Sequence, residues 1–264
     1  MSPRTTADWD AKAYDRLAAP QEEWARTVLE RLPLEGDETV LDAGSGSGRV
    51  TRLLLERLPR GRVIGVDGSV SMIANARESL AEHSERTTFI TSDLLALRPE
   101  LLAEEAGVES VDAVFSNATF HWIADHDQLF SRLFEVLSPG GRLVAQCGGE
   151  GNVRKWVEAV VRTAAREPFA DHVGGFFPWH FYRPKETTER MLAAGFEDVS
   201  CDLEEKAARP DHAQAFIGVV GLASLHERLP EELREPFTEA VLDELPEPLE
   251  LRYIRLNITG RRHG

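Results

Sequence analysis

The alternation of short apolar runs with helical segments between residues 39 and 147 constrains the fold of this chain more than any other feature. The runs are nearly continuous in apolar residues, whereas the segments between them repeat apolar residues at helical spacing. Strands of that composition are covered on both faces, which is typical of a parallel sheet between two helical layers. We therefore expect an α/β fold whose crossovers place a ligand crevice at the carboxyl ends of the strands. The expected strands are 39–43, 62–69, 87–95, 111–123 and 138–147, and the expected helices are 20–32, 49–58, 69–84 and 125–137.

The regular alternation stops after residue 147. A helix and a loop rich in aromatic residues and proline follow over 149–185, a stretch too long for a simple crossover. Because we find no internal repeat, we expect these insertions to interrupt one sheet and the chain to form a single domain over 1–264. The remaining expected elements are a helix and a strand over 185–208, amphipathic helices around 216–225 and 231–245, and a last strand, 249–262, of an antiparallel edge type.

Composition excludes several classes of protein. Hydrophobic residues are 42% of the 264 residues and charged residues 28%, which predicts a packed core rather than disorder. A formal net charge of -15 argues against a dedicated nucleic-acid binder, because such proteins present a basic face. Cys147 and Cys201 form no CxxC pair, so neither a disulfide framework nor a thiolate zinc site is supported. Without a long apolar run or a signal-peptide pattern, we expect a cytoplasmic protein that binds no membrane.

A glycine-rich turn lies between the first expected strand and the helix after it, in the sequence VLDAGSGSG over residues 40–48. Glycine lets a backbone turn tightly and approach a ligand closely, and the next helix supplies free N–H groups at its N-terminus. Asp67 ends the second expected strand, 21 residues after Gly46. A carboxylate there can accept hydrogen bonds from both ribose hydroxyls of a nucleoside.

The glycine spacing distinguishes between two classes of nucleoside cofactor. A dinucleotide-binding turn reads G-x-G-x-x-G/A, whereas here Gly44, Gly46 and Gly48 are followed by Arg49 in the sixth position. Asp42, just before the turn, fits poorly beside a pyrophosphate and well beside an ammonium group. An NAD(P)-dependent oxidoreductase is therefore an alternative that these residues disfavour.

Five motifs, in this order and spacing, resemble class I S-adenosylmethionine-dependent methyltransferases. They read VLDAGSGSGRVT, IGVDGS, FITSDLL, VDAVFSNATFHWI and LSPGGRLVA. The resemblance implies a Rossmann-like, seven-stranded, mostly parallel sheet of order 3-2-1-4-5-7-6, with strand 7 antiparallel and a helical insertion or cap. Trp9, Asp10 and Tyr14, the segment SNATFHWIADHDQLF and the long insertion are similar to the trans-aconitate 2-methyltransferase-like group.

The resemblance also implies an organisation and a set of cofactor contacts. Gly44, Ser45 and Gly46 would line the methionine part of S-adenosylmethionine, Asp42 would face its ammonium group, and Asp67 would bind its ribose. Gly68, Met72, Ser92, Asp93 and Leu94 would surround the adenine, and Asn117, Ala118 and Trp122 would lie near the methionyl group. The implied parts are an N-terminal helical cover (1–35), the cofactor-binding core (36–148), helical substrate-side insertions (149–185 and 208–246) and closing sheet elements (186–207 and 247–264).

The methyl acceptor is expected to be a small molecule bound by His121 and the aromatic insertion. A carboxylate acceptor is already ionised at neutral pH and needs an anion anchor rather than a base, whereas a phenol or an ammonium group needs a base. Arginine pairs bidentately with carboxylates. The candidate acceptor-binding residues are Tyr14, His121, Arg154, Trp179, His180, Tyr182 and Arg183, with His121 also the candidate catalytic residue.

Several readings of the chemistry stay open from the sequence. The leading hypothesis is O-methylation of a carboxylate, and the alternatives are methylation of a phenol, amine or carbon acceptor of a natural product, or a SAM-binding sensor without catalysis. The eight histidines show no metal-ligand spacing, and there is no H-E-x-x-H helix, so we expect no metal.

Overall fold

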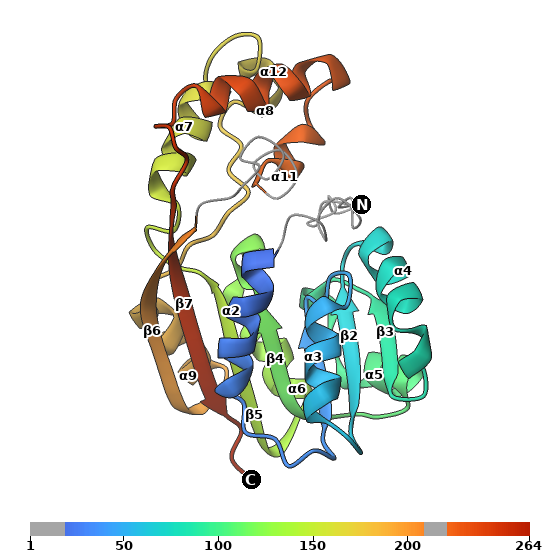
Figure 1. The fold of residues 1–264 in the computed structure, drawn as a ribbon. Helices are drawn as coiled ribbons and strands as arrows, with labels where there is room; N and C mark the ends of the chain where they lie inside the picture. Colours follow the sequence, from blue (N-terminus) through green and yellow to red (C-terminus); the bar gives the residue numbers. More distant parts are fainter. Residues whose placement is uncertain (1–18, 209–220) are drawn as a thin grey trace.

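The computed structural model describes residues 19–208 and 221–264 (Figure 1). Its strands form one seven-stranded sheet in the order β3-β2-β1-β4-β5-β7-β6. β7 runs antiparallel to both of its neighbours, and β1 to β5 pair in parallel. The predicted fold class and strand order are therefore confirmed. The strands are β1 (Thr39–Ala43), β2 (Arg62–Asp67), β3 (Thr87–Thr91), β4 (Val111–Asn117), β5 (Leu137–Gly148), β6 (Glu197–Ala208) and β7 (Leu251–Arg261).

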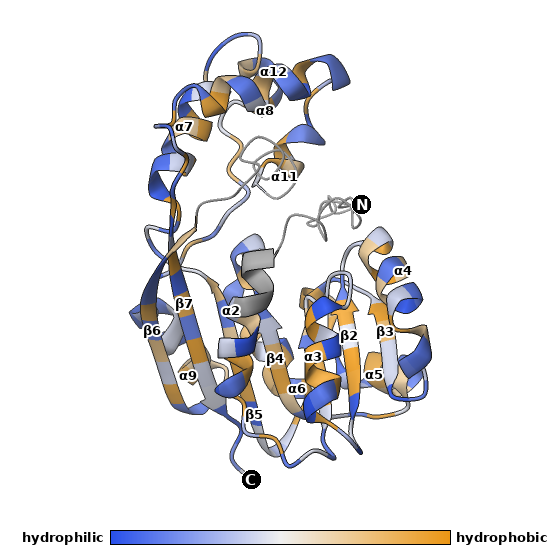
Figure 2. Cartoon of the chain, in the orientation of Figure 1, coloured by the Kyte–Doolittle hydropathy of each residue, from blue (hydrophilic) through white to orange (hydrophobic). Residues whose placement is uncertain are grey.

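Helices cover the sheet on both faces, as the nearly continuous apolar strands predicted. One face packs against a helical layer through a core cluster that includes Leu29, Leu54 and Ile73, and the other through a cluster that includes Leu102 and Leu133. The first layer is α2 (Ala19–Glu30), α3 (Arg49–Arg57) and α4 (Val70–Ser79), and the second is α5 (Pro99–Ala106), α6 (His126–Val136) and α9 (Pro184–Ala193). Figure 2 shows hydrophobic residues concentrated in β2, β3 and β4 between these layers.

Side-chain caps fix the start of two helices beside the carboxyl ends of the strands. Ser69 Oγ accepts a hydrogen bond from the Met72 N–H and begins α4, and Asp125 Oδ1 accepts one from the Gln128 N–H (2.9 Å) and begins α6. Both caps lie at the first residue of an expected helix, 69–84 and 125–137, and they set where the chain leaves each strand. Short 3₁₀ helices complete this edge: η1 (Ala81–His83), η2 (Leu94–Ala96) and η3 (Phe120–Trp122).

A helical cap with its own apolar cluster stands beyond the carboxyl ends of the parallel strands (Figure 1). Trp156, Trp179, Leu225 and Phe237 belong to this cluster, and Leu251 at the start of β7 connects it to the sheet. No helix in the described ranges is long and apolar enough to cross a membrane. The cap helices are α7 (Arg154–Ala164), α8 (Ala170–Val173), α11 (Ala223–His226) and α12 (Glu231–Leu242).

Two expectations about the second half need correction or fall outside the structure. The last strand is not an edge strand: β7 lies between β5 and β6, and β6 forms the edge. The sheet is covered on both faces at β7, where Leu256, Asn257 and Ile258 are all buried. The alternation of polar and apolar residues in this strand therefore did not mark a face exposed to water. The first half of the helix expected around 216–225 falls outside the described residues, and the second half overlaps the short helix Ala223–His226.

Candidate functional site

The glycine turn connects the end of β1 to the start of α3. Gly44, Gly46 and Gly48 have φ values of +84°, +52° and +85°, a backbone region that favours glycine. The N–H groups of Gly44 and Ser45 donate to the Val66 carbonyl oxygen at 2.8 and 3.2 Å. The turn is thereby attached to the end of β2, next to Asp67.

The first and second glycines of the turn serve different purposes. A Cβ added to Gly44 would overlap the side chain of Thr119, which follows β4, whereas a Cβ added to Gly46 would meet no atom of the described chain within 4 Å. The sequence predicted close approach of a ligand along the turn, but at Gly44 the close neighbour is Thr119. Gly46 is the position where the turn is open to a ligand.

Asp67 lies at the end of β2, with its carboxylate directed at the turn. Its Oδ2 accepts a hydrogen bond from the Gly46 N–H (3.0 Å), and its Oδ1 accepts one from the Ser69 N–H (2.8 Å). Burial raises the pKa of Asp67, and these two hydrogen bonds oppose that rise. The side chain is partly exposed, so a carboxylate with two fixed oxygens faces the space beside Gly46.

Asp42 lies beneath the turn and is 1% exposed. Thr51 of α3 donates its hydroxyl to Asp42 Oδ2 at 2.6 Å. Burial raises the pKa of Asp42 to about 7; the nearby Asp67 carboxylate adds to the rise, and the Thr51 hydrogen bond opposes it. A cationic ligand at the turn would favour the ionised form of Asp42.

Two further polar atoms at this edge lack partners within the described chain. Ser45 Oγ and Asn117 Oδ1 are both buried and make no hydrogen bond to residues 19–208 or 221–264. Buried polar atoms are normally hydrogen-bonded, so such atoms at a strand edge indicate a place for a ligand or water. Ala118, the next residue, has a φ of +59°, which is uncommon outside glycine and marks strain at the end of β4.

These features meet where the strand order reverses. β1 pairs with β2 on one side and with β4 on the other, and the chain leaves all three strands at the same edge. In open α/β sheets this switch point is where ligands bind.

The residues expected around an adenine lie at the ends of β2 and β3. The Ser92 N–H donates to the Asp67 carbonyl oxygen (3.0 Å), and Asp93 Oδ1 accepts from the Leu95 N–H (2.9 Å), which caps η2. Met72 is 5% exposed and Leu94 is 4% exposed, Leu94 within the core. Gly68 is partly exposed. The structure brings these residues close to Asp67, while their contact with an adenine stays a prediction.

His121 lies on η3 and is 8% exposed. The Gly148 N–H donates to His121 Nδ1 (3.3 Å), so in the neutral ring the proton is on Nε2. Burial lowers the pKa of His121 well below its usual value, and the positive charge of Arg255 lowers it further. Phe181 stacks on the ring with 5.9 Å between centroids. His121 is therefore a neutral hydrogen-bond donor through Nε2.

Aromatic residues of the insertion connect the cap to this edge. Trp179 is 3% exposed and contacts Trp122, with ring centroids 6.1 Å apart. The His180 N–H donates to the His121 carbonyl oxygen (2.8 Å). The Tyr182 hydroxyl donates to the Ala124 carbonyl oxygen (2.7 Å), so this side chain holds the loop after β4.

The predicted anion anchors are not buried with His121. Arg154 is exposed at the first position of α7. Arg183 is exposed and pairs with Glu150 at 2.7 Å, which raises the pKa of Arg183. Tyr14, with Trp9 and Asp10, lies outside the described residues.

Sequence reasoning missed a buried polar group on β5 and β7. Gln146, Arg255 and Asn257 are 1%, 3% and 2% exposed. Arg255 Nε donates to Gln146 Oε1 (3.1 Å), and Gln146 Nε2 donates to Asn257 Oδ1 (2.7 Å). The available signal was Gln146 within the apolar run 143–147 of β5. β7 alternates polar and apolar residues, so its sequence did not mark Arg255 and Asn257 as buried.

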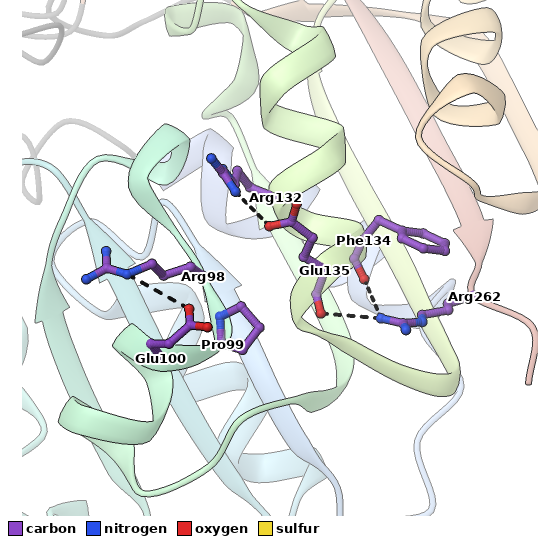
Figure 3. A pocket seen from close by; sticks show the side chains of 7 residues that line it. All are labelled: Arg98, Pro99, Glu100, Arg132, Phe134, Glu135 and Arg262. Atoms are coloured by element: carbon purple, nitrogen blue, oxygen red, sulfur yellow. Dashed lines mark hydrogen bonds and ion pairs between the residues drawn. The ribbon is translucent and has the colours of Figure 1, made fainter.

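A hollow on the side of α5 and α6 is separate from this site, and its lining residues include none of the predicted ones. Figure 3 shows its charges paired among themselves: Arg98 with Glu100, and Arg132 with Glu135 at 2.8 Å. Arg262 donates to the Phe134 carbonyl oxygen (2.9 Å). Within residues 19–208 and 221–264, no group of three or more His, Cys, Asp or Glu side chains is arranged to hold a metal ion.

Comparison with solved structures bears on the fold. The chain is similar to phosphoethanolamine N-methyltransferase 2 of Haemonchus contortus, with a TM-score of 0.61 and 19% identity over 96% of this chain and 57% of the other. It is also similar to YcgJ of Bacillus subtilis, with a TM-score of 0.62 and 15% identity over 92% of this chain and 99% of the other.

Comparison of sequences bears on the family. Trans-aconitate 2-methyltransferase of Variovorax paradoxus is 34% identical over 63% of this chain and 60% of its own length, and that of Escherichia coli is 36% identical over 53% and 51%. The chain thus spans about half to three-fifths of the length of the curated relatives it matches. Residues 40–141 match the family described as a methyltransferase domain. The resemblance to class I methyltransferases is therefore confirmed for residues 40–141, the part of the chain that matches a methyltransferase domain.

Proposed function

We propose that this protein transfers a methyl group from S-adenosylmethionine to a carboxylate of a small molecule. The observation that carries the proposal is the open turn at Gly46 beside the Asp67 carboxylate, at the point where the strand order reverses. A nucleoside with a cationic amino-acid tail matches the groups present there.

The residues of the turn fit this cofactor in charge and in hydrogen-bonding capacity. Asp67 would accept the ribose hydroxyls, and Asp42 would compensate the ammonium group. Ser45 Oγ and Asn117 Oδ1, which lack partners among the described residues, would gain polar neighbours on binding. When bound, S-adenosylmethionine supplies an electrophilic methyl group on a sulfonium.

The chain's own contribution to catalysis would be to orient the acceptor and exclude water. His121 Nδ1 is engaged by the Gly148 N–H and the ring is neutral, so His121 suits donation of a hydrogen bond to an anionic acceptor. Proton removal is not required, because a carboxylate is ionised at neutral pH. This chemistry favours a carboxylate over a phenol or an ammonium acceptor.

Similarity to trans-aconitate 2-methyltransferases supports the same class of acceptor. The aligned part of those relatives covers 50–60% of their length. The glycine turn of this chain lies within residues 40–141, which match a methyltransferase domain. The proposal extends to small di- and tricarboxylates as a class.

Turnover with methyl-labelled S-adenosylmethionine tests the proposal. The acceptor panel contains tricarboxylates, dicarboxylates, phenols and amines, each at the same concentration. We expect label in base-labile methyl esters of the carboxylates. Label only in phenol ethers or methylamines would contradict the acceptor class, and no labelled product across the panel would favour a cofactor-binding protein without catalysis.

A further inference from the structure

Two hydroxyl side chains hold the end of β1 from the side of β4. The backbone pairing of β1 with β4 stops one residue before the end of β1. Beyond it, Ser116 Oγ donates to the Ala43 carbonyl oxygen at 2.6 Å. Thr119 Oγ1 then donates to the Gly44 carbonyl oxygen at 3.3 Å. Side chains of β4 and of the loop after it therefore replace the strand pairing where the glycine turn begins.

Thr119 reaches the glycine turn because the backbone is unusual at two positions. Ala118 has a φ of +59°, and its N–H donates to the Gln146 carbonyl oxygen (2.7 Å), so the chain turns sharply at the end of β4. Gly44 has no Cβ, and a Cβ added there would overlap the Thr119 side chain. The loop after β4 thus packs directly on the backbone of the turn. Strained backbone of the Ala118 kind persists where the surrounding structure fixes it, often at functional sites.

The Thr119 hydroxyl has two acceptors for one proton. Its Oγ1 lies 3.3 Å from the Gly44 carbonyl oxygen and 3.2 Å from the Asn117 carbonyl oxygen. A hydroxyl donates a single hydrogen, so the two oxygens share it. The hydroxyl therefore bridges the glycine turn and the end of β4, the two segments that supply proposed contacts to the methionyl part of the cofactor.

The glycine turn is attached to β2 independently of Thr119. The N–H groups of Gly44 and Ser45 donate to the Val66 carbonyl oxygen at 2.8 and 3.2 Å. Asp67 Oδ2 accepts a hydrogen bond from the N–H of the next residue of the turn. Loss of the Thr119 contact would leave these bonds in place, and with them the ribose side of the proposed cofactor site.

Thr119 also begins the short helix that carries His121. The Trp122 N–H donates to the Thr119 carbonyl oxygen (3.0 Å), which closes η3. The His121 ring is held from the side of β5, because the Gly148 N–H donates to its Nδ1. At Thr119, therefore, the glycine turn attached to β2 meets the helix that holds His121 against β5.

We propose that Thr119 is a positioning residue that sets the distance between the glycine turn and His121. This inference rests on the function proposed above, in which His121 contacts the acceptor. Methyl transfer needs the acceptor oxygen aligned with the methyl carbon and the sulfur, and a misplacement of about 1 Å can cost about 100-fold in rate. Thr119 acts through Gly44 and η3, without a contact of its own to the reacting groups.

The test compares Thr119→Val and Thr119→Ser with Thr87→Val. Thr119→Val keeps the shape but puts a methyl group where the hydroxyl meets two carbonyl oxygens, whereas Thr119→Ser keeps the hydroxyl. Thr87 is the matched control, because it is also partly exposed and donates its hydroxyl to a backbone carbonyl, that of His83, at 3.0 Å. It is the first residue of β3, at the end of the strand away from the proposed site.

Three quantities are measured for each protein: kcat, the Kd of S-adenosylhomocysteine by calorimetry, and stability to urea. The acceptor is the carboxylate that the wild-type protein methylates fastest in the panel above. Thr119→Val should lower kcat about tenfold or more, whereas Thr119→Ser should keep it within about threefold. The cofactor Kd should stay within about threefold in both, because the turn stays attached to β2.

The control separates positioning from stability. Thr87→Val should reduce the stability to urea about as much as Thr119→Val does, because each loses one hydroxyl bond to a backbone carbonyl. Its kcat should nevertheless stay within about twofold of wild type. A merely structural role of Thr119 would give no fall in kcat beyond that of the control.

Crystal structures with S-adenosylhomocysteine give a second measurement that needs no acceptor. In Thr119→Val the distance between the Cα atoms of Gly44 and His121 should change by about 0.5 Å or more, the tolerance within which catalytic groups are held. In Thr87→Val that distance should equal the wild-type distance.

Three results would overturn the positioning role while leaving the proposed function intact. They are a kcat of Thr119→Val within about twofold of wild type, an equal fall in kcat in Thr119→Ser, and an unchanged distance between Gly44 and His121 in the Thr119→Val crystals. If Thr119→Val does not fold, Thr119→Ala, which removes the hydroxyl without adding a methyl group in its place, is judged on the same criteria. Failure of the proposed function is distinguishable, because the wild-type protein would then methylate no carboxylate, while the crystal distances would still test Thr119.

Discussion

At the scale of single residues, the site depends on two carboxylates in different surroundings. Asp67 is partly exposed and held by two backbone N–H groups, whereas Asp42 is buried beneath the turn and bonded to Thr51. Asp67 is positioned to accept hydrogen bonds from hydroxyl groups, whereas the ionisation of Asp42 depends on the charges near it. This difference allows the contribution of Asp42 to be measured without any ligand.

Asp42 should make the ligand-free protein less stable as the pH rises. Because its pKa is raised from 3.8 to about 7 on folding, the native state keeps a proton that the unfolded state loses between these values. The free energy of unfolding should therefore fall from about pH 4 to pH 7 and level off above it. In Asp42→Asn this fall should be reduced by roughly 1–4 kcal/mol.

Urea denaturation of wild type and Asp42→Asn at pH 5, 6, 7 and 8 measures this difference. Asp37→Asn is the control, since Asp37 is exposed and pairs with Arg60 at 3.6 Å. Parallel stability curves for wild type and Asp42→Asn would contradict the role of the buried carboxylate.

At the scale of elements, the turn between β1 and α3 combines a packed glycine with an open one. A Cβ at Gly44 would overlap Thr119, and a Cβ at Gly46 meets nothing nearby in the described chain. Gly46→Ala should cost about 1–2 kcal/mol, from the left-handed backbone alone. Gly44→Ala should lower the free energy of unfolding by the same amount and by about 1–3 kcal/mol more, because the loop after β4 must move.

The double variant Gly44→Ala/Thr119→Ala tests the source of the extra cost. Removing the Thr119 side chain should recover most of the difference between the two single glycine variants, as measured by urea denaturation. Equal stabilities of Gly44→Ala and Gly46→Ala would show that Thr119 does not constrain the turn.

Most of these elements could be predicted because local pattern and fold agree. Apolar runs such as 62–67 and the helical spacing between them predicted the strands and helices, and the resemblance implied the sheet order. The packing of Thr119 on Gly44 could not be predicted, since it joins residues 75 positions apart. Arg255 was missed because an arginine in an alternating strand normally faces water, whereas here it is buried, with its guanidinium carbon 5.7 Å from the ring centroid of Trp24 on α2.

At the scale of the whole molecule, the cap and the sheet have separate apolar clusters. Trp179 lies in the cap cluster and contacts Trp156, with ring centroids 4.8 Å apart, and Trp122 near the sheet. Apart from Trp122, which packs against the cap cluster, the proposed cofactor contacts lie at the ends of the strands. Loss of cap packing should therefore affect acceptor binding more than cofactor binding.

Trp179→Ala should lower the free energy of unfolding by about 3–5 kcal/mol, as expected for a buried tryptophan. It should raise the acceptor KM while leaving the cofactor Kd within threefold. Phe177→Ala is the control, because Phe177 contacts the Trp179 ring at 5.4 Å between centroids but is 42% exposed. This substitution should lower the free energy of unfolding by about 1 kcal/mol or less. Equal destabilisation by both substitutions, measured by thermal and urea unfolding, would contradict a packed cap.

Isothermal titration of wild type and Asp67→Ala with S-adenosylmethionine, S-adenosylhomocysteine and NADH tests the central claim most directly. The wild-type protein should bind the two sulfur nucleosides and not NADH. Asp67→Ala should weaken their binding about tenfold or more, because a hydrogen bond to a charged group contributes about 1.5–3 kcal/mol. Binding of NADH in place of the sulfur nucleosides, or an unchanged affinity in Asp67→Ala, would contradict the assignment of the turn and Asp67 as the cofactor site.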